Sequence, residues 1–262
     1  MSEYKVLFLD IDGTIITPDD SIEETTIKSI QQVQEKGIEV FLATGRPLHE
    51  IRELAKKLNV RSLIGYNGAY GIYQGKDLFQ EPMNKKSVQQ FLEIAKNNKH
   101  EAVLYTKDKN IFTDLNVDFV QEFIEKFHLH KNDSFTPSKD YEVLGMTLIN
   151  VDPKDLSFYR NEDGIHLTQV NVEGMRHCYD VIRDKINKGI GVQYILKHLG
   201  VNKEHAIAFG DGLNDKEMLM NVGEGFAMGN GHPDLFQFAK HKTTTVSDSG
   251  IYNGLKKLGV IE

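Results

Sequence analysis

The amino-acid sequence predicts an α/β protein, in which both ends of the chain form a doubly wound, Rossmann-like parallel sheet and an α+β domain is inserted between them. Three observations predict this fold. Apolar, strand-sized runs alternate with helical patterns near the N-terminus, and the same alternation returns near the C-terminus. The middle of the chain instead holds several short alternating strands. Strand–helix alternation is typical of parallel sheets, whereas hairpin-like strands are typical of antiparallel ones.

The N-terminal part contains three predicted strands and two predicted helices. Residues 4–9 are largely apolar, as expected of a strand buried on both faces of a parallel sheet. A helical pattern follows and ends at Gly37, because glycine suits the position just after a helix. A second helix is predicted from Pro47, since the fixed φ angle of proline suits the first helical position. The other predicted features are strands at 38–43 and 62–65 and a hairpin turn at 71–75.

The C-terminal part repeats this rhythm, and the middle departs from it. The C-terminal elements are predicted at 191–199 (helix), 206–210 (strand), 215–222 (helix), 225–228 (strand) and 234–239 (helix). The middle has predicted helices at 87–97 and 117–127, and predicted strands at 102–106, 110–113, 143–151, 165–170 and 177–182. We therefore expect a core domain made of residues 1–83 and 184–262, with an inserted α+β domain at 84–183.

Composition and charge exclude several classes of protein. With 262 residues the chain can bury a full core without disulfides, and its one cysteine, Cys178, has no partner for an internal one. Its 31 basic and 38 acidic residues give a net charge of −7, which disfavours binding to nucleic acid. The sequence contains neither a signal-peptide core nor an apolar run of membrane-spanning length. We expect a soluble cytoplasmic protein that binds neither nucleic acid nor a membrane; its oligomeric state is left open.

The first candidate for chemistry is residues 10–14, Asp-Ile-Asp-Gly-Thr, where the first predicted strand ends. Alternate residues of a strand point to the same face, so the carboxylates of Asp10 and Asp12 are expected side by side. Two like charges at that distance raise one pKa unless a cation lies nearby. Ligands of open parallel sheets bind beyond the carboxyl ends of the strands. The alternative, a turn with solvated acids, is the commoner meaning of so short a motif taken alone.

The second candidate is residues 210–215, Gly-Asp-Gly-Leu-Asn-Asp, which follow another predicted strand. Asp211, Asn214 and Asp215 offer oxygen ligands of the kind that Mg²⁺ prefers. The alternative is helix capping, with Asn214 as the N-cap, Glu217 as its capping-box partner and Asp215 near the positive end of the helix dipole. Capping accounts for those three residues but leaves Asp211 unexplained.

Two further segments suit an anion. Thr44 and Gly45 end a strand and lead into a predicted helix, where a hydroxyl and exposed N–H groups attract negative charge. Lys188 precedes another predicted helix and carries the charge to hold an anion bound there. The alternatives are a plain strand-to-helix turn and a solvated lysine. Together the four segments supply acids for Mg²⁺ and donors for a phosphate, which are the parts that phosphoryl transfer needs.

These segments resemble the haloacid dehalogenase-like (HAD) hydrolase superfamily, in particular its Cof-type phosphatases. The resemblance rests on D-x-D-G-T at 10–14, T-G-R at 44–46, the lysine at 188 and G-D-x-x-N-D at 210–215. The segments 62–69 and 226–230 are similar to segments of the same subfamily. The resemblance implies an HAD core with an inserted cap domain. It also implies a Mg²⁺-dependent phosphatase that hydrolyses a small phosphorylated metabolite, a phosphate monoester, through an aspartyl-phosphate intermediate.

The resemblance also implies a role for each motif residue. Asp10 would be the nucleophile, and Asp12 would protonate the leaving group and then activate water. Mg²⁺ would be held by the Asp10 carboxylate, the Asp12 backbone carbonyl and the Asp211 carboxylate, with Asp215 close by. The phosphoryl oxygens would be held by the backbone of Ile11 and by Thr44, Gly45, Lys188 and Asn214.

Other functions stay open beside this one. A phosphomutase or phosphotransferase has the same fold, and a receiver-like signalling domain also accepts a phosphoryl group on an aspartate. Sugar phosphates, nucleotides, pyridoxal phosphate and flavin mononucleotide are all open as substrates. Tyr105, Arg160 and Arg176 are candidates for substrate contacts from the inserted domain, although a surface position without a function is the commoner meaning of such residues.

Overall fold

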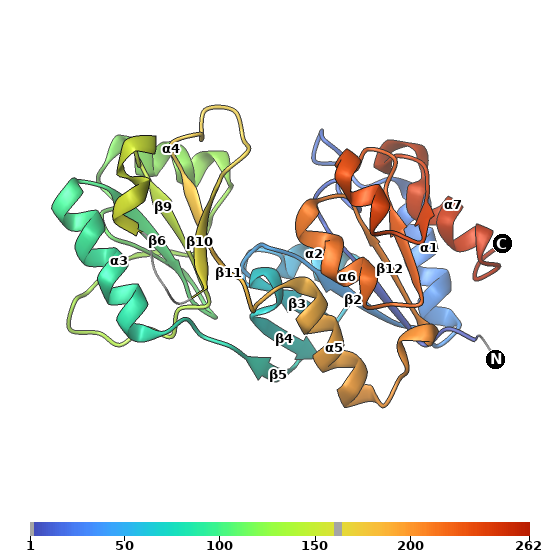
Figure 1. The fold of residues 1–262 in the computed structure, drawn as a ribbon. Helices are drawn as coiled ribbons and strands as arrows, with labels where there is room; N and C mark the ends of the chain where they lie inside the picture. Colours follow the sequence, from blue (N-terminus) through green and yellow to red (C-terminus); the bar gives the residue numbers. More distant parts are fainter. Residues whose placement is uncertain (1–2, 160–163) are drawn as a thin grey trace. The chain divides into compact units, whose positions relative to one another are not determined.

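The computed structural model describes residues 3–159 and 164–262, which form two compact units (Figure 1). The first unit comprises Met1–Arg46, Arg52–Phe79 and Asn187–Glu262, and the second comprises Pro47–Ile51 and Gln80–Ile186. The sequence patterns predicted domain boundaries at 83/84 and 183/184, whereas the units divide at 79/80 and 186/187. No sequence pattern indicated that Pro47–Ile51 belongs to the second unit. No helix in the described part of the chain has both the length and the apolar character that a membrane crossing requires.

The first unit is built on an eight-stranded sheet with the order β14-β13-β12-β1-β2-β3-β4-β5. Its strands are β1 (Val6–Leu9), β2 (Glu39–Ala43), β3 (Ser62–Gly65), β4 (Tyr70–Tyr73), β5 (Lys76–Gln80), β12 (Ala206–Gly210), β13 (Glu224–Ala227) and β14 (His241–Lys242). The strands from β14 to β3 are parallel, as predicted, whereas β4 runs antiparallel to β3. The hairpin turn predicted at 71–75 is confined to Gln74 and Gly75, because residues 71–73 belong to β4.

The central strand β1 pairs with strands from both the N-terminal and the C-terminal parts of the chain. All four of its residues are buried, and it pairs with β2 on one side and with β12 on the other. In this register Leu9 lies opposite both Leu42 and Phe209. The residues that follow β1, β2 and β12 therefore meet at one edge of the sheet. That edge is the carboxyl end of three parallel strands, where ligands of such sheets bind.

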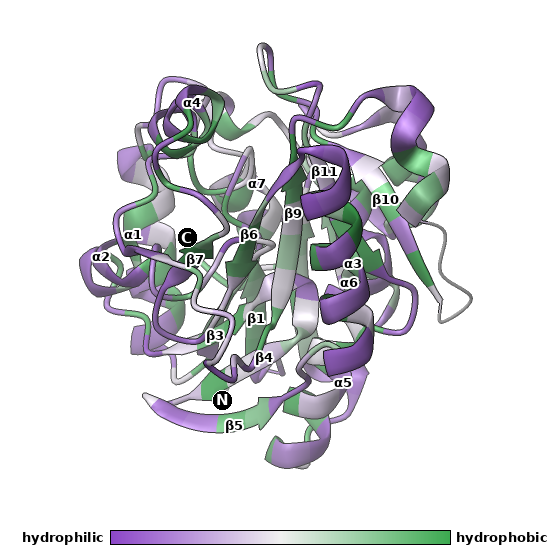
Figure 2. Ribbon diagram, turned by 90° about the vertical axis from the view of Figure 1, so that its left-hand side faces the viewer, coloured by the Kyte–Doolittle hydropathy of each residue, from purple (hydrophilic) through white to green (hydrophobic). Residues whose placement is uncertain are grey.

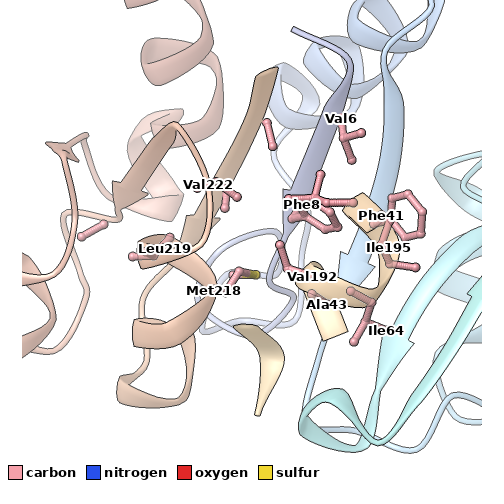
Figure 3. Packing of buried hydrophobic residues seen from close by; sticks show 14 of the residues in the cluster. Val6, Phe8, Phe41, Ala43, Ile64, Val192, Ile195, Met218, Leu219 and Val222 are labelled. Carbon is pink, nitrogen blue, oxygen red and sulfur yellow. The ribbon is translucent and has the colours of Figure 1, made fainter. Parts of the chain in front are cut away.

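Helices cover both faces of this sheet, as a doubly wound fold requires. On one face α5 (Lys188–Leu199) and α6 (Lys216–Met220) bury Val192 and Met218 in a core that includes Phe8 (Figure 3). On the other face α1 (Glu24–Glu35) packs beside α7 (Gly250–Lys257), whose Gly254 lies against Phe209. The remaining helices are α2 (Arg52–Lys57) and the 3₁₀ helices η1 (Tyr66–Gly68), η3 (Lys203–His205), η4 (Leu213–Asp215), η5 (Pro233–Gln237) and η6 (Val246–Asp248).

Several helix predictions were wrong in their bounds. The helix predicted from Pro47 begins only at Arg52, because the five residues before it belong to the second unit. The helix predicted from 191 begins at Lys188, where the Asn187 side chain caps it by accepting from the N–H of Ile190 at 3.0 Å. The glycines at 189 and 191 are the reason why this first turn was not predicted, since glycine disfavours helices. In place of the predicted helix at 215–222 the structure has the 3₁₀ helix η4 followed by α6. The helix predicted at 234–239 is the 3₁₀ helix η5. The helix α7 and the strand β14 were not predicted.

The second unit is built on a six-stranded sheet with the order β10-β11-β9-β6-β7-β8. Its strands are β6 (Glu101–Tyr105), β7 (Asn110–Phe112), β8 (Asn132–Ser134), β9 (Gly145–Ile149), β10 (Ile165–Gln169) and β11 (Tyr179–Arg183). Its neighbouring strands are antiparallel, as predicted, except that β7 and β8 are parallel. The polar strand β8, with the sequence Asn-Asp-Ser, lacks the apolar alternation that would have predicted it.

Two helices enclose the second sheet from opposite faces. α3 (Lys85–Asn98) packs on a core that includes Ala102 and Leu104, and α4 (Asp118–Lys126) packs on one that includes Val103. Alternate residues of β6 thus point to different helices, as strand geometry requires. Along its length α3 is both purple and green in Figure 2, as an amphipathic helix should be. The unit also contains the 3₁₀ helix η2 (Pro153–Tyr159).

The segment Pro47–Ile51 is bound within the second unit by polar contacts. The Glu50 carboxylate accepts hydrogen bonds from Asn110 Nδ2 at 2.7 Å and from the backbone N–H of His130 at 3.1 Å. His49 Nε2 lies 3.0 Å from Asn110 Oδ1. Burial alone would raise the pKa of Glu50, but hydrogen bonds from His49, Asn110 and His130 lower it to about 2. Glu50 is therefore a carboxylate whose charge is fully compensated.

Candidate active site

The predicted site residues come from loops that begin where the strands of the first unit end. Asp10 directly follows β1, Asp211 follows β12 and Thr44 follows β2. Lys188 is the first residue of α5, the helix that packs on the same sheet. The parallel register of β2, β1 and β12 brings these loops together, although up to about 200 residues separate them in the sequence. The residues of these four segments all belong to the first unit.

A buried lysine lies between two carboxylates. Lys188 Nζ donates to Asp10 Oδ1 at 2.5 Å and to Asp215 Oδ1 at 2.6 Å, and the lysine is only 1% exposed. Burial lowers the pKa of Lys188, but the charges of Asp10 and Asp215 outweigh this and hold it above the ordinary value. The interpretation of Lys188 as a solvated lysine was therefore wrong. The two carboxylates favour the charged form of its ammonium group.

Three carboxylates cluster beside this ammonium group. Asp10, Asp211 and Asp215 each offer an oxygen within 4.8 Å of the others. Burial and the charge of Asp215 raise the pKa of Asp10 well above its usual range, and the same two causes raise the pKa of Asp211 to about 6. The three carboxylates carry more negative charge than Lys188 offsets, and they offer oxygen ligands. Both properties suit a hard divalent cation such as Mg²⁺. The sequence-based expectation of a clustered acid site is thus compatible with the geometry.

Hydrogen bonds within the loop and from Thr14 hold the Asp211–Asp215 loop in place. Asp215 Oδ2 accepts from the backbone N–H groups of Asp211 at 3.0 Å and Gly212 at 2.9 Å, and Thr14 Oγ1 donates to Asp211 Oδ1 at 3.0 Å. Gly13 has φ +78°, and a Cβ there would collide with the Asp211 carboxylate, so glycine is needed at this position. The alternative that Asn214 caps the following helix was wrong. The N-cap position is Gly212, and the Asp215 carboxylate accepts the N–H of Gly212.

Asp12, which was expected side by side with Asp10, is not part of the cluster of Asp10, Asp211 and Asp215. Its carboxylate accepts from Arg46 Nε at 2.8 Å and from Arg46 Nη2 at 2.5 Å, and its side chain is half exposed. The alternation of a strand does not reach Asp12 because β1 ends at Leu9 and the chain then bends. In this bend the carbonyl of Ile11 accepts the N–H groups of Thr14, Ile15 and Ile16. The two aspartates of the motif thus have different partners, Lys188 for Asp10 and Arg46 for Asp12.

Backbone donors surround the same point. Thr44 is buried, and its Oγ1 accepts from the N–H of Arg46 at 3.0 Å. Within residues 3–159 and 164–262, no acceptor is paired with the backbone N–H of Ile11, Asp12 or Gly45. Unpaired N–H groups at the ends of parallel strands are ready donors for an anion.

Two asparagines of the site were not singled out as site residues from the sequence. Asn67, with φ +52°, lies next to Gly45, and its Oδ1 accepts from Asn214 Nδ2 at 3.1 Å. Asn230 Nδ2 donates to the carbonyl of Gly13 at 2.8 Å, and its Oδ1 accepts from the N–H of Val246 at 2.8 Å. Both lie in the segments 62–69 and 226–230, whose resemblance to the subfamily was the available signal.

The three candidates in the inserted domain have different outcomes. Tyr105 is half-buried, its hydroxyl is bonded to Thr147 Oγ1 at 3.0 Å, and burial and the charge of Asp180 raise its pKa. The expectation of a plain surface residue is therefore wrong for Tyr105. Arg176 is exposed, as expected of a surface residue. Arg160 lies outside the described residues.

Comparisons with known proteins agree with this geometry. A family model described as haloacid dehalogenase-like hydrolase matches residues 7–255. Putative phosphatase YkrA of Bacillus subtilis is 28% identical over 263 residues, which cover 99% of this chain and 100% of the relative. The 5-amino-6-(5-phospho-D-ribitylamino)uracil phosphatase YitU of the same organism is 28% identical over 280 residues, 96% of each chain. A hypothetical protein of Geobacillus kaustophilus has a similar solved structure, with a TM-score of 0.91, 27% identity and coverage of 98% and 100%.

Proposed function

Since the chain belongs to the haloacid dehalogenase-like hydrolase family, we propose that it is a Mg²⁺-dependent phosphatase that hydrolyses a small phosphorylated metabolite through an aspartyl-phosphate on Asp10. The family match and the phosphatases among its relatives identify it as a phosphoric monoester hydrolase. The observation that carries the finer proposal is the setting of Asp10. Its carboxylate lies against a buried ammonium group and two further acids, at a strand end where backbone N–H groups are unpaired.

In this proposal the first unit is the catalytic core and the second is the cap domain. Asp10 and Asp211, with the backbone carbonyl of Asp12, would hold the Mg²⁺. Asp215 is better suited to support them than to bind the ion directly, because Lys188 and two backbone N–H groups already occupy both of its oxygens. When bound, Mg²⁺ offsets the repulsion between the phosphate and the Asp10 carboxylate.

The chain's own groups account for the rest of the reaction. The phosphoryl oxygens would accept hydrogen bonds from Lys188, from the Thr44 hydroxyl and from the backbone N–H groups of Ile11 and Gly45, with Asn214 nearby. An Asp10 oxygen would attack phosphorus as the bond to the leaving oxygen breaks, and Asp12 would protonate that oxygen. Asp12 would then take a proton from the water that attacks the aspartyl-phosphate, which releases phosphate and restores Asp10.

Arg46 is a positioning residue for Asp12 in this scheme. Its guanidinium holds the Asp12 carboxylate from two nitrogens, a geometry that fixes both distance and plane. With p-nitrophenyl phosphate, whose leaving group needs little protonation, Asp12→Ala should stall the hydrolysis of the aspartyl-phosphate, because the base for the water is lost. Phosphoenzyme trapped by acid quench in this variant would support the role of Asp12, and full turnover would contradict it.

The deciding experiment measures phosphate release from p-nitrophenyl phosphate and from a panel of phosphorylated metabolites. We expect release with Mg²⁺, none with EDTA, and a loss of at least about 10³-fold in Asp10→Asn, since removal of a nucleophile abolishes covalent catalysis. Asp234→Asn, which changes an exposed aspartate of the same unit, is the matched control and should retain full activity. Near-normal activity in folded Asp10→Asn would disprove the assignment of Asp10 as the nucleophile.

A phosphomutase or phosphotransferase is the second candidate function, because it uses the same first half-reaction. It would pass the phosphoryl group to a sugar hydroxyl and would release little free phosphate. Turnover in ¹⁸O-labelled water separates the two, since only hydrolysis puts the label into the released phosphate. The hydrolase family match disfavours the receiver-like signalling domain.

A further inference from the structure

Three polar side chains form a row across neighbouring strands of the second unit. Tyr105, Thr147 and Asp180 belong to β6, β9 and β11, which are adjacent in its sheet (Figure 1). Thr147 lies opposite Asp180 in the register of β9 and β11, and its Oγ1 donates to Asp180 Oδ1 at 2.6 Å. The Tyr105 hydroxyl lies 3.0 Å from the same Oγ1. These three residues, the polar row, are therefore linked by hydrogen bonds within one unit.

The polar row lies on a face of the sheet that is otherwise apolar. Two residues away along the same three strands are Val103, Ile149 and Cys178, which belong to the core on which α4 packs. Alternate residues of a strand point to the same face, so the polar row continues the face that α4 covers. A carboxylate beside an apolar core lowers stability unless donors or a cation offset its charge. Packing alone therefore does not account for Asp180.

The direction of the hydrogen bonds leaves an acceptor at each end of the polar row. A threonine hydroxyl has one proton, and that of Thr147 goes to Asp180, so the Tyr105 hydroxyl donates to Thr147. The oxygen of Tyr105 then keeps a lone pair that can accept. At the other end, Asp180 Oδ2 has no hydrogen-bond partner in the part of the chain that the structure describes. A ligand at the polar row must therefore supply hydrogen-bond donors.

The unpaired oxygen of Asp180 is open to a ligand. Asp180 is half-buried, and among the described side chains that are not exposed, the one enclosed polar atom without a partner is His177 Nε2. Asp180 Oδ2 also lacks a partner, so it must retain accessible surface. Burial raises the pKa of Asp180, and the hydrogen bond from Thr147 lowers it only in part. A second donor would therefore stabilise the ionised carboxylate.

We propose that Asp180 and Tyr105 determine substrate specificity by accepting hydrogen bonds from hydroxyl or ammonium groups on the organic part of the substrate. This inference rests on the proposed phosphatase function. It narrows the substrate to phosphate monoesters that carry such donors, as sugar, polyol and aminoalkyl phosphates do. A site that bonds a hydroxyl discriminates strongly against the analogue without one, because its own polar group is then left unpaired. Thr147 is a positioning residue, since it holds both acceptors.

The test compares phosphate esters that differ in these donors. With Mg²⁺, kcat/KM is measured for ribitol 5-phosphate against pentyl phosphate, and for 2-aminoethyl phosphate against ethyl phosphate. We expect the unchanged protein to prefer the member with donors in at least one pair, by about tenfold or more. Asp180→Asn can still accept from Thr147, but it replaces Oδ2 by an amide group that donates. In this variant the preference should disappear.

Two further variants and a reference ester separate specificity from a general loss of activity. Each kcat/KM is divided by that for p-nitrophenyl phosphate with the same variant, because this ester has no donor on its leaving group. Tyr105→Phe should lower the preference less than Asp180→Asn, since hydrogen bonds to a charged acceptor are the stronger ones. Asp133→Asn is the matched control and should keep the full preference. Asp133 is an exposed acid of the same sheet, and its register partner Ile111 belongs to the core on which α3 packs.

Each outcome bears on the inference. A preference that is lost in Asp180→Asn and kept in Asp133→Asn supports it, and the pair of esters that shows the preference distinguishes a hydroxyl from an ammonium ligand. Equal kcat/KM within both pairs would overturn the inference and leave the proposed function intact, and so would an unchanged preference in Asp180→Asn. If no ester releases phosphate, p-nitrophenyl phosphate included, the proposed function itself is contradicted and the inference falls with it.

Discussion

The two units each bury charged side chains, and they treat them in opposite ways. In the second unit, Glu50 receives hydrogen bonds from Asn110 and His130, and its pKa falls to about 2. In the first unit, Lys188 donates to Asp10 and Asp215, and burial and the charge of Asp215 raise the pKa of both Asp10 and Asp211. The residue class is the same, but the supply of donors and positive charge differs.

This contrast distinguishes a structural carboxylate from a functional one. A carboxylate with a full set of donors contributes to stability and has nothing left to bind. A cluster with more negative charge than its surroundings can offset is destabilising by itself, and a bound cation relieves it. The first arrangement anchors Pro47–Ile51 within the second unit, and the second is typical of sites that do chemistry.

The largest expected effect comes from removing the ammonium group that contacts the acid cluster. Lys188→Met should destabilise the metal-free protein by about 3–5 kcal/mol, because breaking a buried ion pair leaves uncompensated charge. Urea unfolding at pH 7 in EDTA measures this, and added Mg²⁺ should restore part of the loss. Lys197→Met, on the exposed side of the same helix, is the control. If Lys188→Met lowers the free energy of unfolding no more than Lys197→Met does, the acid cluster does not depend on Lys188 and the contrast with Glu50 is contradicted.

Removing the compensated charge should have a smaller effect with its own pH dependence. Glu50→Gln is expected to cost about 1–3 kcal/mol at pH 7, as hydrogen bonds to a charged group are lost. Because the pKa of Glu50 is lowered to about 2, its contribution is complete above about pH 4.5 and disappears as the pH falls through 2. The stability difference from the unchanged protein should therefore shrink below pH 4.5. Glu53→Gln, an exposed neighbour, should show no such change.

The smallest effect concerns Mg²⁺ affinity and pH. The pKa of Asp211 is raised to about 6 in the metal-free protein, so below pH 6 the ion must displace a proton. We expect affinity to fall as the pH is lowered, by at least about tenfold per unit below pH 6, since the pKa of Asp10 is raised as well. Isothermal titration calorimetry at four pH values tests this, with Asp211→Asn as the control. An affinity independent of pH down to 5 would show that the cluster is already ionised without the metal.

Local sequence patterns were enough to predict the main elements of the first sheet and the strand-end positions of the candidate residues. The apolar run before Asp10 and the one before Asp211 correspond to β1 and β12. These predictions succeed because burial and turn chemistry depend on neighbours along the chain. Elements with weak local signals were missed, among them the polar strand β8 and the first turn of α5 with its two glycines.

The partners of the charged residues were decided only by the tertiary structure. Asp10 and Asp12 are two residues apart, yet one is bound to Lys188 and the other to Arg46. The same holds for Asn67 with Asn214 and for Glu50 with His130. Such contacts depend on which strands pair and in which register, and they join residues from about 30 to nearly 200 positions apart. The sequence by itself determined which groups reach the edge of the sheet, and the fold decided which of them meet, because side-chain partners depend on distances that no local pattern encodes.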